Sequence, residues 1–282
     1  MELSDALYLS KQVLLQAGVP SPEADSYWLL AHTLEIPKSE LLTLLTLGYQ
    51  LTEAQAGGFK ENLDKRASRI PLQHITGSAG FRNIELHVGP GVFIPRYETE
   101  QVVEIAIKIL SGLPGRPRVV DVGTGSGAIA ISLAKETAAD VYAIEIDAAA
   151  AEFAIMNIKS LTANVDLRIG KFEEELPKLR DLDLIISNPP YIPLDAVPVD
   201  PEVRDFDPQL ALYSGADGLE AIKELIALAP VSLKSGGWVV LEHADGQSDM
   251  VCELLLSAGY EAIRAHPDAA GRLRAVSAKW RS

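Results

Sequence analysis

The spacing of apolar residues divides the chain into a helical first part and a longer second part in which strands and helices alternate. Across residues 1–72 apolar positions recur every three or four residues, as at Leu41, Leu44 and Leu45, which fall on one face of a helix. Gly48 follows where that helix is expected to end, because glycine readily adopts the left-handed conformation of a helix terminus. Residues 1–72 are therefore predicted to form a small all-helical domain.

Helix starts in this domain are marked by a hydroxyl-bearing residue followed by an acid. Ser39 and Thr52 each precede a glutamate, and a hydroxyl at this position can accept a hydrogen bond from the free N–H groups of the first turn. We expect Trp28, Leu29 and Leu30 to pack against the apolar face described above. The expected role of the domain is packing or partner binding rather than chemistry.

Residues 73–97 are predicted to link this domain to the rest of the chain through a β-hairpin. Two short extended runs, 81–88 and 92–94, are separated by Gly-Pro-Gly at 89–91, which is a strong turn signal. The hairpin turn is therefore expected at 89–91.

Residues 98–282 are predicted to form an α/β domain. A helix over 98–110 comes first, and the predicted strands are 118–122, 141–144, 165–169, 182–187, 238–241 and two closing strands, with helices over 128–135, 148–159, 218–228 and 247–258. Such alternation predicts a mostly parallel sheet with helices on both faces. In sheets of this kind ligands bind beyond the carboxyl ends of the strands.

Composition excludes several classes of protein. With 282 residues, 48% of them hydrophobic, the chain can bury a sizeable core without disulfides or a metal. Cys252 is the only cysteine, and the five histidines are scattered, so no metal site is expected. The acidic start of the chain does not resemble a signal peptide, which favours a cytoplasmic protein. The net charge of −14 argues against a general nucleic-acid or DNA-binding protein, which gains affinity by neutralising phosphates.

A glycine-rich loop joins the first strand of the α/β domain to its helix. It runs from Asp121 through Gly123, Gly125 and Gly127, and Glu145 ends the next strand, where an acid can meet ribose hydroxyls. Glycines allow a ligand to approach the backbone, and the N-terminal amides of the helix face it. The pattern fits a dinucleotide-binding loop and the loop of a class I methyltransferase equally well, and it leaves the nucleotide ligand open between them.

The motif Asn188-Pro189-Pro190-Tyr191 directly follows the apolar run 182–187. Two prolines can continue neither a strand ladder nor a helix, so the motif is expected to be a stiff, extended exit from the sheet. The Asn188 side chain and the Pro189 carbonyl can accept hydrogen bonds from a target NH₂ group and turn its nitrogen towards a methyl donor. The motif is similar to the signature of S-adenosylmethionine-dependent enzymes that methylate amide-like or exocyclic nitrogens. Tyr191 is expected to close the pocket with its ring.

The chain also resembles, over most of its length, the protein-(glutamine-N5) methyltransferase family that modifies peptide chain release factors (the HemK family). The matching stretches are 71–77, 93–96, 98–100, 121–128, 188–192, 211–212, 217–219, 241–243 and 271–272. The resemblance implies a class I methyltransferase fold, Rossmann-like, with a seven-stranded sheet. It also implies that the substrate is the glutamine of the Gly-Gly-Gln motif of class 1 release factors, whose body would dock on the helical domain 1–72. No metal and no direct nucleic-acid or membrane partner is implied.

The resemblance further implies roles for individual residues. S-adenosylmethionine, with S-adenosylhomocysteine as its product, would be contacted by Asp121, Gly123, Thr124, Gly125, Ser126, Gly127, Glu145, Phe172, Asn188 and Phe93. The glutamine would be held by Asn188, Pro189, Pro190, Tyr191 and Arg96, of which Asn188, Pro189 and Tyr191 are the candidate catalytic residues. For Arg96, a salt bridge that anchors the linker is an equally good interpretation.

The chain departs from the family pattern at three positions. Lys171 stands where an aspartate is usual beside Phe172, Tyr97 replaces a proline, and Asp207 replaces a glutamate. We expect activity to survive these changes because none involves Asn188, whereas the affinity for the cofactor could differ. Three other hypotheses remain at this level: glutamine methylation of a ribosomal protein, N6 methylation of adenine, and a non-enzymatic protein in which the sheet binds nucleotide only as a regulator.

Overall fold

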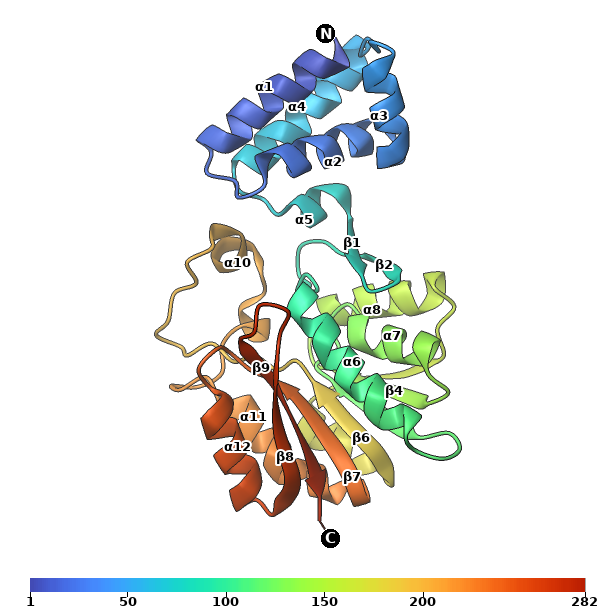
Figure 1. Ribbon diagram of the computed structural model, residues 1–282, viewed down its shortest axis with the longest axis vertical. Coiled ribbons are helices and arrows are strands. Elements are labelled where there is room, and N and C mark those ends of the chain that lie inside the picture. Colours follow the sequence, from blue (N-terminus) through green and yellow to red (C-terminus); the bar gives the residue numbers. More distant parts are fainter. Residues whose placement is uncertain (282) are drawn as a thin grey trace. The chain divides into compact units, whose positions relative to one another are not determined.

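In the computed structural model, which describes residues 1–281, the chain folds as two units (Figure 1). The first comprises Met1–Ser78 together with Pro198–Phe206, and the second comprises Ala79–Val197 and the chain from Asp207 onward. The first unit thus includes a short segment from far along the chain, which the apolar pattern does not predict. Each unit has its own core.

The first unit is helical, as predicted for the start of the chain. Its helices are α1 (Leu3–Gln16), α2 (Pro22–Leu34), α3 (Lys38–Thr46), α4 (Glu53–Ala67), α5 (Leu72–Thr76) and α10 (Pro201–Phe206). The core of this unit is built mainly from leucines, and Leu3, Leu14, Leu29, Leu30 and Leu41 are completely buried. Full burial of a leucine side chain contributes about 1.5–3 kcal/mol, so this cluster is the main source of the unit's stability.

One predicted helix start in this unit is confirmed, and two other expectations are wrong. Helix α4 begins after Thr52 with a capping box in which Gln55 is the partner, as the hydroxyl signal predicted. Helix α3 instead begins at Lys38 with Pro37 before it, so the start predicted at Ser39 is wrong; proline already has the backbone angle that leads into a helix. Trp28 is 48% exposed, so its predicted packing is also wrong.

The linker contains a hairpin, but not where the turn signal placed it. The strands are β1 (Ser78–Phe81) and β2 (Ile84–His87), and the turn between them uses Arg82 with a φ of 49°. The predicted second strand at 92–94 is not a strand. Val92 and Ile94 are buried in the core of the second unit, so their alternation reflects packing rather than strand pairing.

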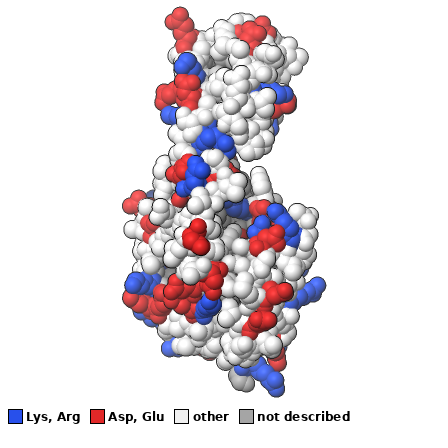
Figure 2. Space-filling view, turned by 90° about the vertical axis from the view of Figure 1, so that its left-hand side faces the viewer, with Lys and Arg blue, Asp and Glu red and all other residues white. Residues whose placement is uncertain are grey.

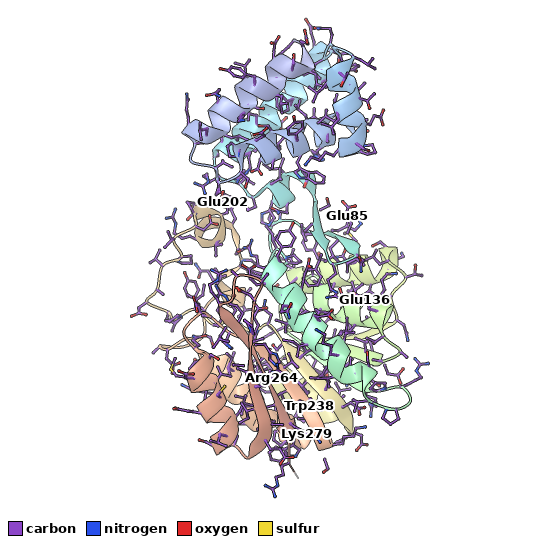
Figure 3. The ribbon with its side chains drawn as sticks, viewed as in Figure 1. Glu85, Glu136, Glu202, Trp238, Arg264 and Lys279 are labelled. Carbon is purple, nitrogen blue, oxygen red and sulfur yellow. The ribbon has the colours of Figure 1, made fainter. Side chains whose placement is uncertain are left out.

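The second unit contains a seven-stranded, mostly parallel sheet, as predicted. Its strands are β3 (Arg118–Val122), β4 (Asp140–Glu145), β5 (Val165–Ile169), β6 (Leu182–Ser187), β7 (Leu233–Glu242), β8 (Tyr260–Pro267) and β9 (Leu273–Trp280), in the order β5-β4-β3-β6-β7-β9-β8. Strand β9 alone runs in the direction opposite to the other six strands, so it pairs antiparallel with both β7 and β8, as in the pair Trp238–Lys279 between β7 and β9 (Figure 3). Every residue of β6 is buried, because a central parallel strand is covered on both faces.

Helices cover both faces of this sheet (Figure 1). One face packs against α6 (Tyr97–Ser111), α7 (Ala128–Glu136) and α8 (Ala148–Ser160), and the other against α11 (Glu220–Leu228) and α12 (Ser248–Ser257). The remaining short elements are α9 (Phe172–Glu175) and the 3₁₀ turns η1 (Leu176–Lys178), η2 (Gln209–Ala211) and η3 (Ala229–Val231). Among residues 1–281 no helix is both long and apolar enough to cross a membrane.

The strand register brings the predicted motifs to one edge of the sheet. Val122, the last residue of β3, pairs with Ile144 of β4 on one side and with Ser187 of β6 on the other. Strand order reverses at β3, so the crevice beyond its carboxyl end is the expected ligand site. The residues that follow these three strand positions are Gly123, Glu145 and Asn188, and they therefore begin side by side.

Candidate active site at the carboxyl ends of the strands

The glycines of the loop after β3 serve two different purposes. Gly123, Gly125 and Gly127 have φ values of 74°, 57° and 87°, which favour glycine over any other residue. A Cβ on Gly127 would lie 2.9 Å from Cδ1 of Ile131, so the Ile131 side chain in α7 would have to shift to admit it. A Cβ on Gly123 or Gly125 would meet no atom within 4 Å, which leaves open space for a ligand beside the backbone.

Asp121 ties this loop to the start of α7. Its buried Oδ2 accepts hydrogen bonds from Thr124 Oγ1 at 2.5 Å and from the Ala130 N–H at 3.2 Å. Its buried Oδ1 has no hydrogen-bond partner within residues 1–281. Burial raises the pKa of Asp121 to about 7, against the lowering effect of the Thr124 and Ala130 hydrogen bonds. Because buried oxygens are rarely unpaired, Oδ1 is suited to a ligand or an ordered water.

Glu145 lies between the loop and the following strand. Its Oε2 accepts a hydrogen bond from the Gly125 N–H at 2.7 Å, and its Oε1 accepts one from the Asp147 N–H at 2.8 Å. Burial raises the pKa of Glu145, and the backbone N–H groups of Asp147, Gly125 and Ile146 lower it. A carboxylate offers about four acceptor positions, so Glu145 can still accept a hydrogen bond from a ribose hydroxyl. Phe172 comes two residues after Gly170, whose N–H donates to the Glu145 carbonyl at 2.8 Å.

The Asn188-Pro189-Pro190-Tyr191 motif is held at both ends. The Asn188 Nδ2 donates to Thr99 Oγ1 at 3.1 Å, and the Tyr191 carbonyl accepts from Gln247 Nε2 at 3.0 Å. The Tyr191 hydroxyl lies 3.4 Å from Glu242 Oε1, to which it donates. Burial, with the nearby Glu242 charge, raises the pKa of Tyr191 above its usual range, so the phenol stays neutral and cannot act as a general base near neutral pH.

Arg96 and Phe93 lie next to this motif. The Arg96 guanidinium lies 4.9 Å from the centre of the Phe93 ring and makes a 2.6 Å ion pair with Asp207. Its charge acts to lower the pKa of Tyr191, which places the cation near that phenol. Asp207, one of the departures from the family pattern, therefore still supplies a buried carboxylate to Arg96. Tyr97 is 82% exposed, so this departure does not affect packing.

Three residues of the site were given no role from the sequence, Thr99, Gln247 and Glu242, although Thr99 and Glu242 lie in the matching stretches 98–100 and 241–243. Glu242 ends β7, the parallel neighbour of β6, so the rule that ligands bind at strand ends could have identified it. Thr99 lies in the first turn of α6 and Gln247 just before α12, and no local pattern marks either of them.

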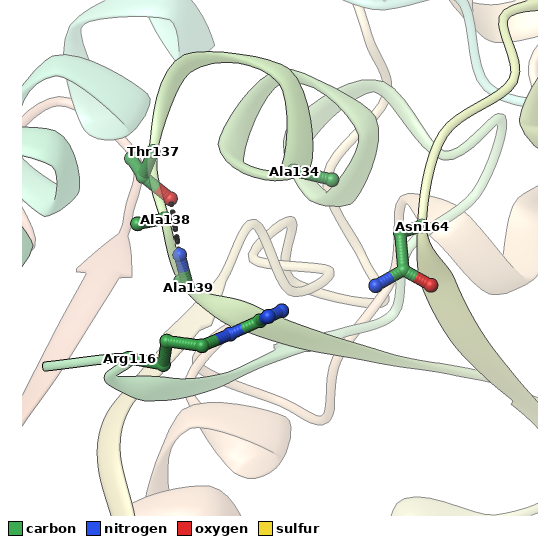
Figure 4. A pocket seen from close by; sticks show the side chains of 6 residues that line it. All are labelled: Arg116, Ala134, Thr137, Ala138, Ala139 and Asn164. Atoms are coloured by element: carbon green, nitrogen blue, oxygen red, sulfur yellow. Dashed lines mark hydrogen bonds between the residues drawn. The ribbon is translucent and has the colours of Figure 1, made fainter.

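A second, shallow hollow of about 260 Å³ lies near the start of β4, away from these strand ends (Figure 4). Its lining includes three alanines, Arg116, Thr137 and Asn164. Arg116 is paired with Asp140, and Thr137 Oγ1 accepts from the Ala139 N–H at 3.2 Å. The hollow contains no acid–base pair or nucleophile. Within residues 1–281 no group of three or more His, Cys, Asp and Glu residues is arranged to hold a metal ion.

Comparisons with known proteins bear on both units. A family model described as the PrmC N-terminal domain matches residues 5–77, and one described as the methyltransferase small domain matches residues 83–197. The release factor glutamine methyltransferase of Streptomyces coelicolor is 42% identical over 273 residues, which cover 95% of this chain and 94% of that protein. The protein of the same name from Bifidobacterium longum is 38% identical over 289 residues, covering 97% and 98%.

Among solved structures, the 16S rRNA N2 G1207 methyltransferase of T. thermophilus, determined with AdoMet and guanosine, is similar in fold. Its TM-score is 0.53 at 22% identity, over 72% of this chain and 50% of that one. At this identity the similarity concerns the fold alone.

Proposed function

The chain belongs to the release factor glutamine methyltransferase family, and we propose that it methylates the glutamine of the Gly-Gly-Gln motif in class 1 release factors. Membership of this family makes it an enzyme, a methyltransferase that acts on a protein glutamine. The methyl donor in the proposal is S-adenosylmethionine, and the acceptor is the side-chain nitrogen, N5. The strongest support is the strand register that brings Gly123, Glu145 and Asn188 to one edge of the sheet.

The residues at this edge fit such a donor. The space beside Gly123 and Gly125 is open, Glu145 can accept a further hydrogen bond, and Asp121 has a buried oxygen without a partner. The residues that would hold the donor are Asp121, Gly123, Thr124, Gly125, Ser126, Gly127, Glu145, Phe172, Asn188 and Phe93. When bound, S-adenosylmethionine supplies a methyl group on a positively charged sulfur that departs as the neutral thioether of S-adenosylhomocysteine.

The Asn188 motif would hold the glutamine. Because the Asn188 nitrogen is engaged by Thr99, its oxygen remains available to accept a hydrogen bond from the glutamine NH₂, together with the Pro189 carbonyl. These acceptors would turn the nitrogen lone pair towards the methyl carbon. The new N–C bond would form as the S–C bond breaks, and the nitrogen would give up one proton to water. Pro190, Tyr191 and Arg96 would line the pocket, with Tyr191 as a neutral ring rather than a base.

In this mechanism catalysis comes from alignment and from fixed dipoles. An amide nitrogen is a poor nucleophile because its lone pair is delocalised into the carbonyl. Well-oriented groups can lower such a barrier by several kcal/mol without a covalent intermediate. The stiff Pro189-Pro190 pair and the buried strand before it supply this rigidity.

The charge distribution favours a protein substrate over nucleic acid. The chain carries a net charge of −14. On the face shown in Figure 2, Lys and Arg side chains lie next to Asp and Glu and form no continuous basic stripe. A nucleic-acid methyltransferase needs cationic contacts to the phosphate backbone. We place the reaction in the cytoplasm, where release factors act.

One labelling experiment tests the proposal. The protein is incubated with methyl-labelled S-adenosylmethionine and, separately, with a release factor, the same factor with its motif glutamine changed to alanine, ribosomal proteins or DNA. We expect label only in the unaltered release factor. Label in DNA alone, or equal label in the two forms of the factor, would overturn the proposal.

A pair of variants then tests the role of Asn188. Asn188→Ala should lower the rate by ~10²-fold, as expected when one preorganised polar group is removed from an active site. Asn164→Ala, in the shallow hollow, is the matched control and should keep the wild-type rate. A normal rate for Asn188→Ala would show that the asparagine does not hold the substrate.

A further inference from the structure

A chain of buried polar side chains connects the two ends of the Asn188–Tyr191 motif. The Asn188 Nδ2 donates to Thr99 Oγ1 at 3.1 Å, and the Tyr191 hydroxyl donates to Glu242 Oε1 at 3.4 Å. The Thr99 hydroxyl faces Glu242 closely enough to lower the pKa of that carboxyl. Thr99 is 4% exposed and Glu242 is 2% exposed. These two residues come from the first turn of α6 and the end of β7, so two separate elements enclose the motif.

The direction of the hydrogen bonds in this chain follows from the charge of Glu242. A carboxylate can only accept hydrogen bonds, so both the Tyr191 and the Thr99 hydroxyls must donate to it. The Thr99 oxygen then has only lone pairs left for Asn188 and accepts from the amide nitrogen. An Asn188 amide flipped by 180° would turn its oxygen towards an atom that has no proton to give, and this orientation is disfavoured.

We propose that Thr99 and Glu242 are positioning residues for methyl transfer, which hold the Asn188 amide with its oxygen free for the NH₂ group of the substrate glutamine. The proposal rests on the proposed role of Asn188 as the acceptor for that group. Neither residue needs to touch the donor or the reacting atoms. Their effect is exerted through the orientation of one side chain.

Groups from several elements set the protonation of Glu242. Burial and the charge of Glu98 raise its pKa, the Thr99 and Tyr191 hydroxyls and the Arg274 charge lower it, and the resulting pKa is about 7. Its Oε2 has no hydrogen-bond partner within residues 1–281, so a proton added to the carboxyl finds an acceptor only on the Oε1 side, at the hydroxyls of Tyr191 and Thr99. A Glu242 protonated on that side has a hydrogen to donate, and it no longer forces Thr99 to accept from Asn188. The rate is therefore expected to fall as the pH is lowered through about 7.

Variants of Thr99 test the orientation directly. Thr99→Val keeps the shape of the side chain but removes the hydroxyl, and it should lower kcat roughly tenfold, the effect of one hydrogen bond. Thr99→Ser restores the hydroxyl and should recover most of the rate. The dissociation constant for S-adenosylmethionine should change much less than kcat in both variants, because the other residues proposed to hold the donor are unaltered. Thr137→Val, the same change at a partly buried threonine beside the shallow hollow, should leave kcat unaltered.

The pH profile tests Glu242. Wild-type enzyme should lose activity at acid pH with a midpoint near 7, and Glu242→Gln should be slower at neutral pH and should lose this acid limb. Asp183→Asn removes a buried carboxylate at the other end of β6 and should retain the limb.

The outcomes separate this inference from the proposed function. Failure of the wild-type enzyme to label release factor would sink the proposed function. A wild-type rate in Thr99→Val, a defect that Thr99→Ser does not relieve, or an acid limb that persists in Glu242→Gln would each overturn the positioning role while the function stands.

Discussion

The backbone N–H of Gly125 donates a hydrogen bond to Glu145 Oε2 at 2.7 Å. This bond joins the glycine loop after β3 to the acid that ends β4. The second oxygen of Glu145 accepts from the Asp147 N–H at 2.8 Å, so the carboxylate is fixed from both sides. The acid proposed to bind the ribose is therefore already oriented by the protein backbone, and little conformational freedom remains to be lost when a ligand binds.

Glu145→Ala is expected to weaken the binding of S-adenosylmethionine by ~10-fold or more. Removing an ionised hydrogen-bond acceptor typically costs about 1.5–3 kcal/mol, and 1.4 kcal/mol corresponds to a tenfold change in affinity. Isothermal titration calorimetry measures this directly. Glu136→Ala, which removes a glutamate from the end of α7, serves as the control and should bind normally. An unchanged affinity in a folded Glu145→Ala protein would remove Glu145 from the cofactor site.

Alanine at Gly127 and at Gly125 should have different consequences. Both positions have positive φ, so both variants carry a strain of about 1–2 kcal/mol. At Gly127 the added Cβ also lies 2.9 Å from Ile131, so Gly127→Ala should lower the melting temperature further. At Gly125 the Cβ enters open space, so the main loss should be in affinity for S-adenosylmethionine. Thermal denaturation and calorimetry distinguish the two, and equal effects of both variants on both measurements would contradict this division of roles.

Much of the second unit could be predicted from sequence because its strands are short apolar runs with clear ends. The run 182–187 is buried along its whole length, and the two prolines after it can only end the strand. The loop 123–127 was likewise predicted correctly, because its glycines adopt the positive φ values of a turn between β3 and α7. Parallel neighbours then bring strand ends together, and so the relation between Gly123, Glu145 and Asn188 follows from the fold class.

Contacts between residues far apart in the chain could not be predicted in this way. Thr99 and Asn188 are 89 positions apart, and their contact depends on how α6 crosses the sheet, which no local pattern records.

The misplaced hairpin shows a second reason why sequence patterns fail to predict structure. Val92 and Ile94 alternate like a strand because both are buried, and periodicity alone does not distinguish burial in a loop from burial in a ladder.

Glu202 joins the segment 198–206 to the N-terminal helices of the first unit. It lies on α10 (Figure 3) and accepts from Arg66 Nη2 at 2.8 Å and from Arg69 Nε at 2.7 Å. The side chains of Arg66 and Glu202 are 6% and 12% exposed. Arg66 also pairs with Asp25 at 2.7 Å. Loss of Glu202 would therefore leave two arginines without one of their acceptors.

Glu202→Gln is expected to destabilise the first unit by about 2 kcal/mol at pH 7, the value of a charge-assisted hydrogen bond. Burial acts to raise the pKa of Glu202, but hydrogen bonds involving Arg69, Asp200 and Arg66 outweigh it and hold the pKa at about 2. A lowered pKa stabilises the folded state above the unfolded pKa and ceases to do so as the pH falls towards the folded pKa. The difference between the two proteins should therefore shrink as the pH falls from about 4.5 to about 2.

Urea denaturation followed by circular dichroism at several pH values measures this difference. Asp205→Asn is the matched control, because Asp205 is on the same helix in an exposed pair with Arg204, and its stability should stay close to that of wild type. Equal stability of wild type and Glu202→Gln at pH 7 would show that the ion pairs contribute nothing.

Gly218 packs directly against the end of the Asn188–Tyr191 motif. A Cβ at this position would lie 2.3 Å from the Tyr191 carbonyl oxygen and 2.9 Å from Gln247 Nε2. These two atoms form the 3.0 Å hydrogen bond that holds the exit of the motif. An added methyl group therefore has to displace the backbone of Tyr191, because movement of the Gln247 side chain alone would not relieve the closer contact with the carbonyl oxygen.

Gly218→Ala is expected to lower kcat by ~10²-fold, since displacements of about 1 Å in a positioned site can cost that much. Gly246→Ala is the matched control: its φ of 86° is similar to the 75° of Gly218, but its Cβ would meet nothing within 4 Å. Both variants share the backbone strain, so the ratio of their rates isolates the clash with Tyr191. Affinity for S-adenosylmethionine should remain near wild type in both variants, because the glycine loop that follows β3 is not altered by either substitution. Equal rates in the two variants would mean that the position of the Tyr191 backbone does not limit methyl transfer.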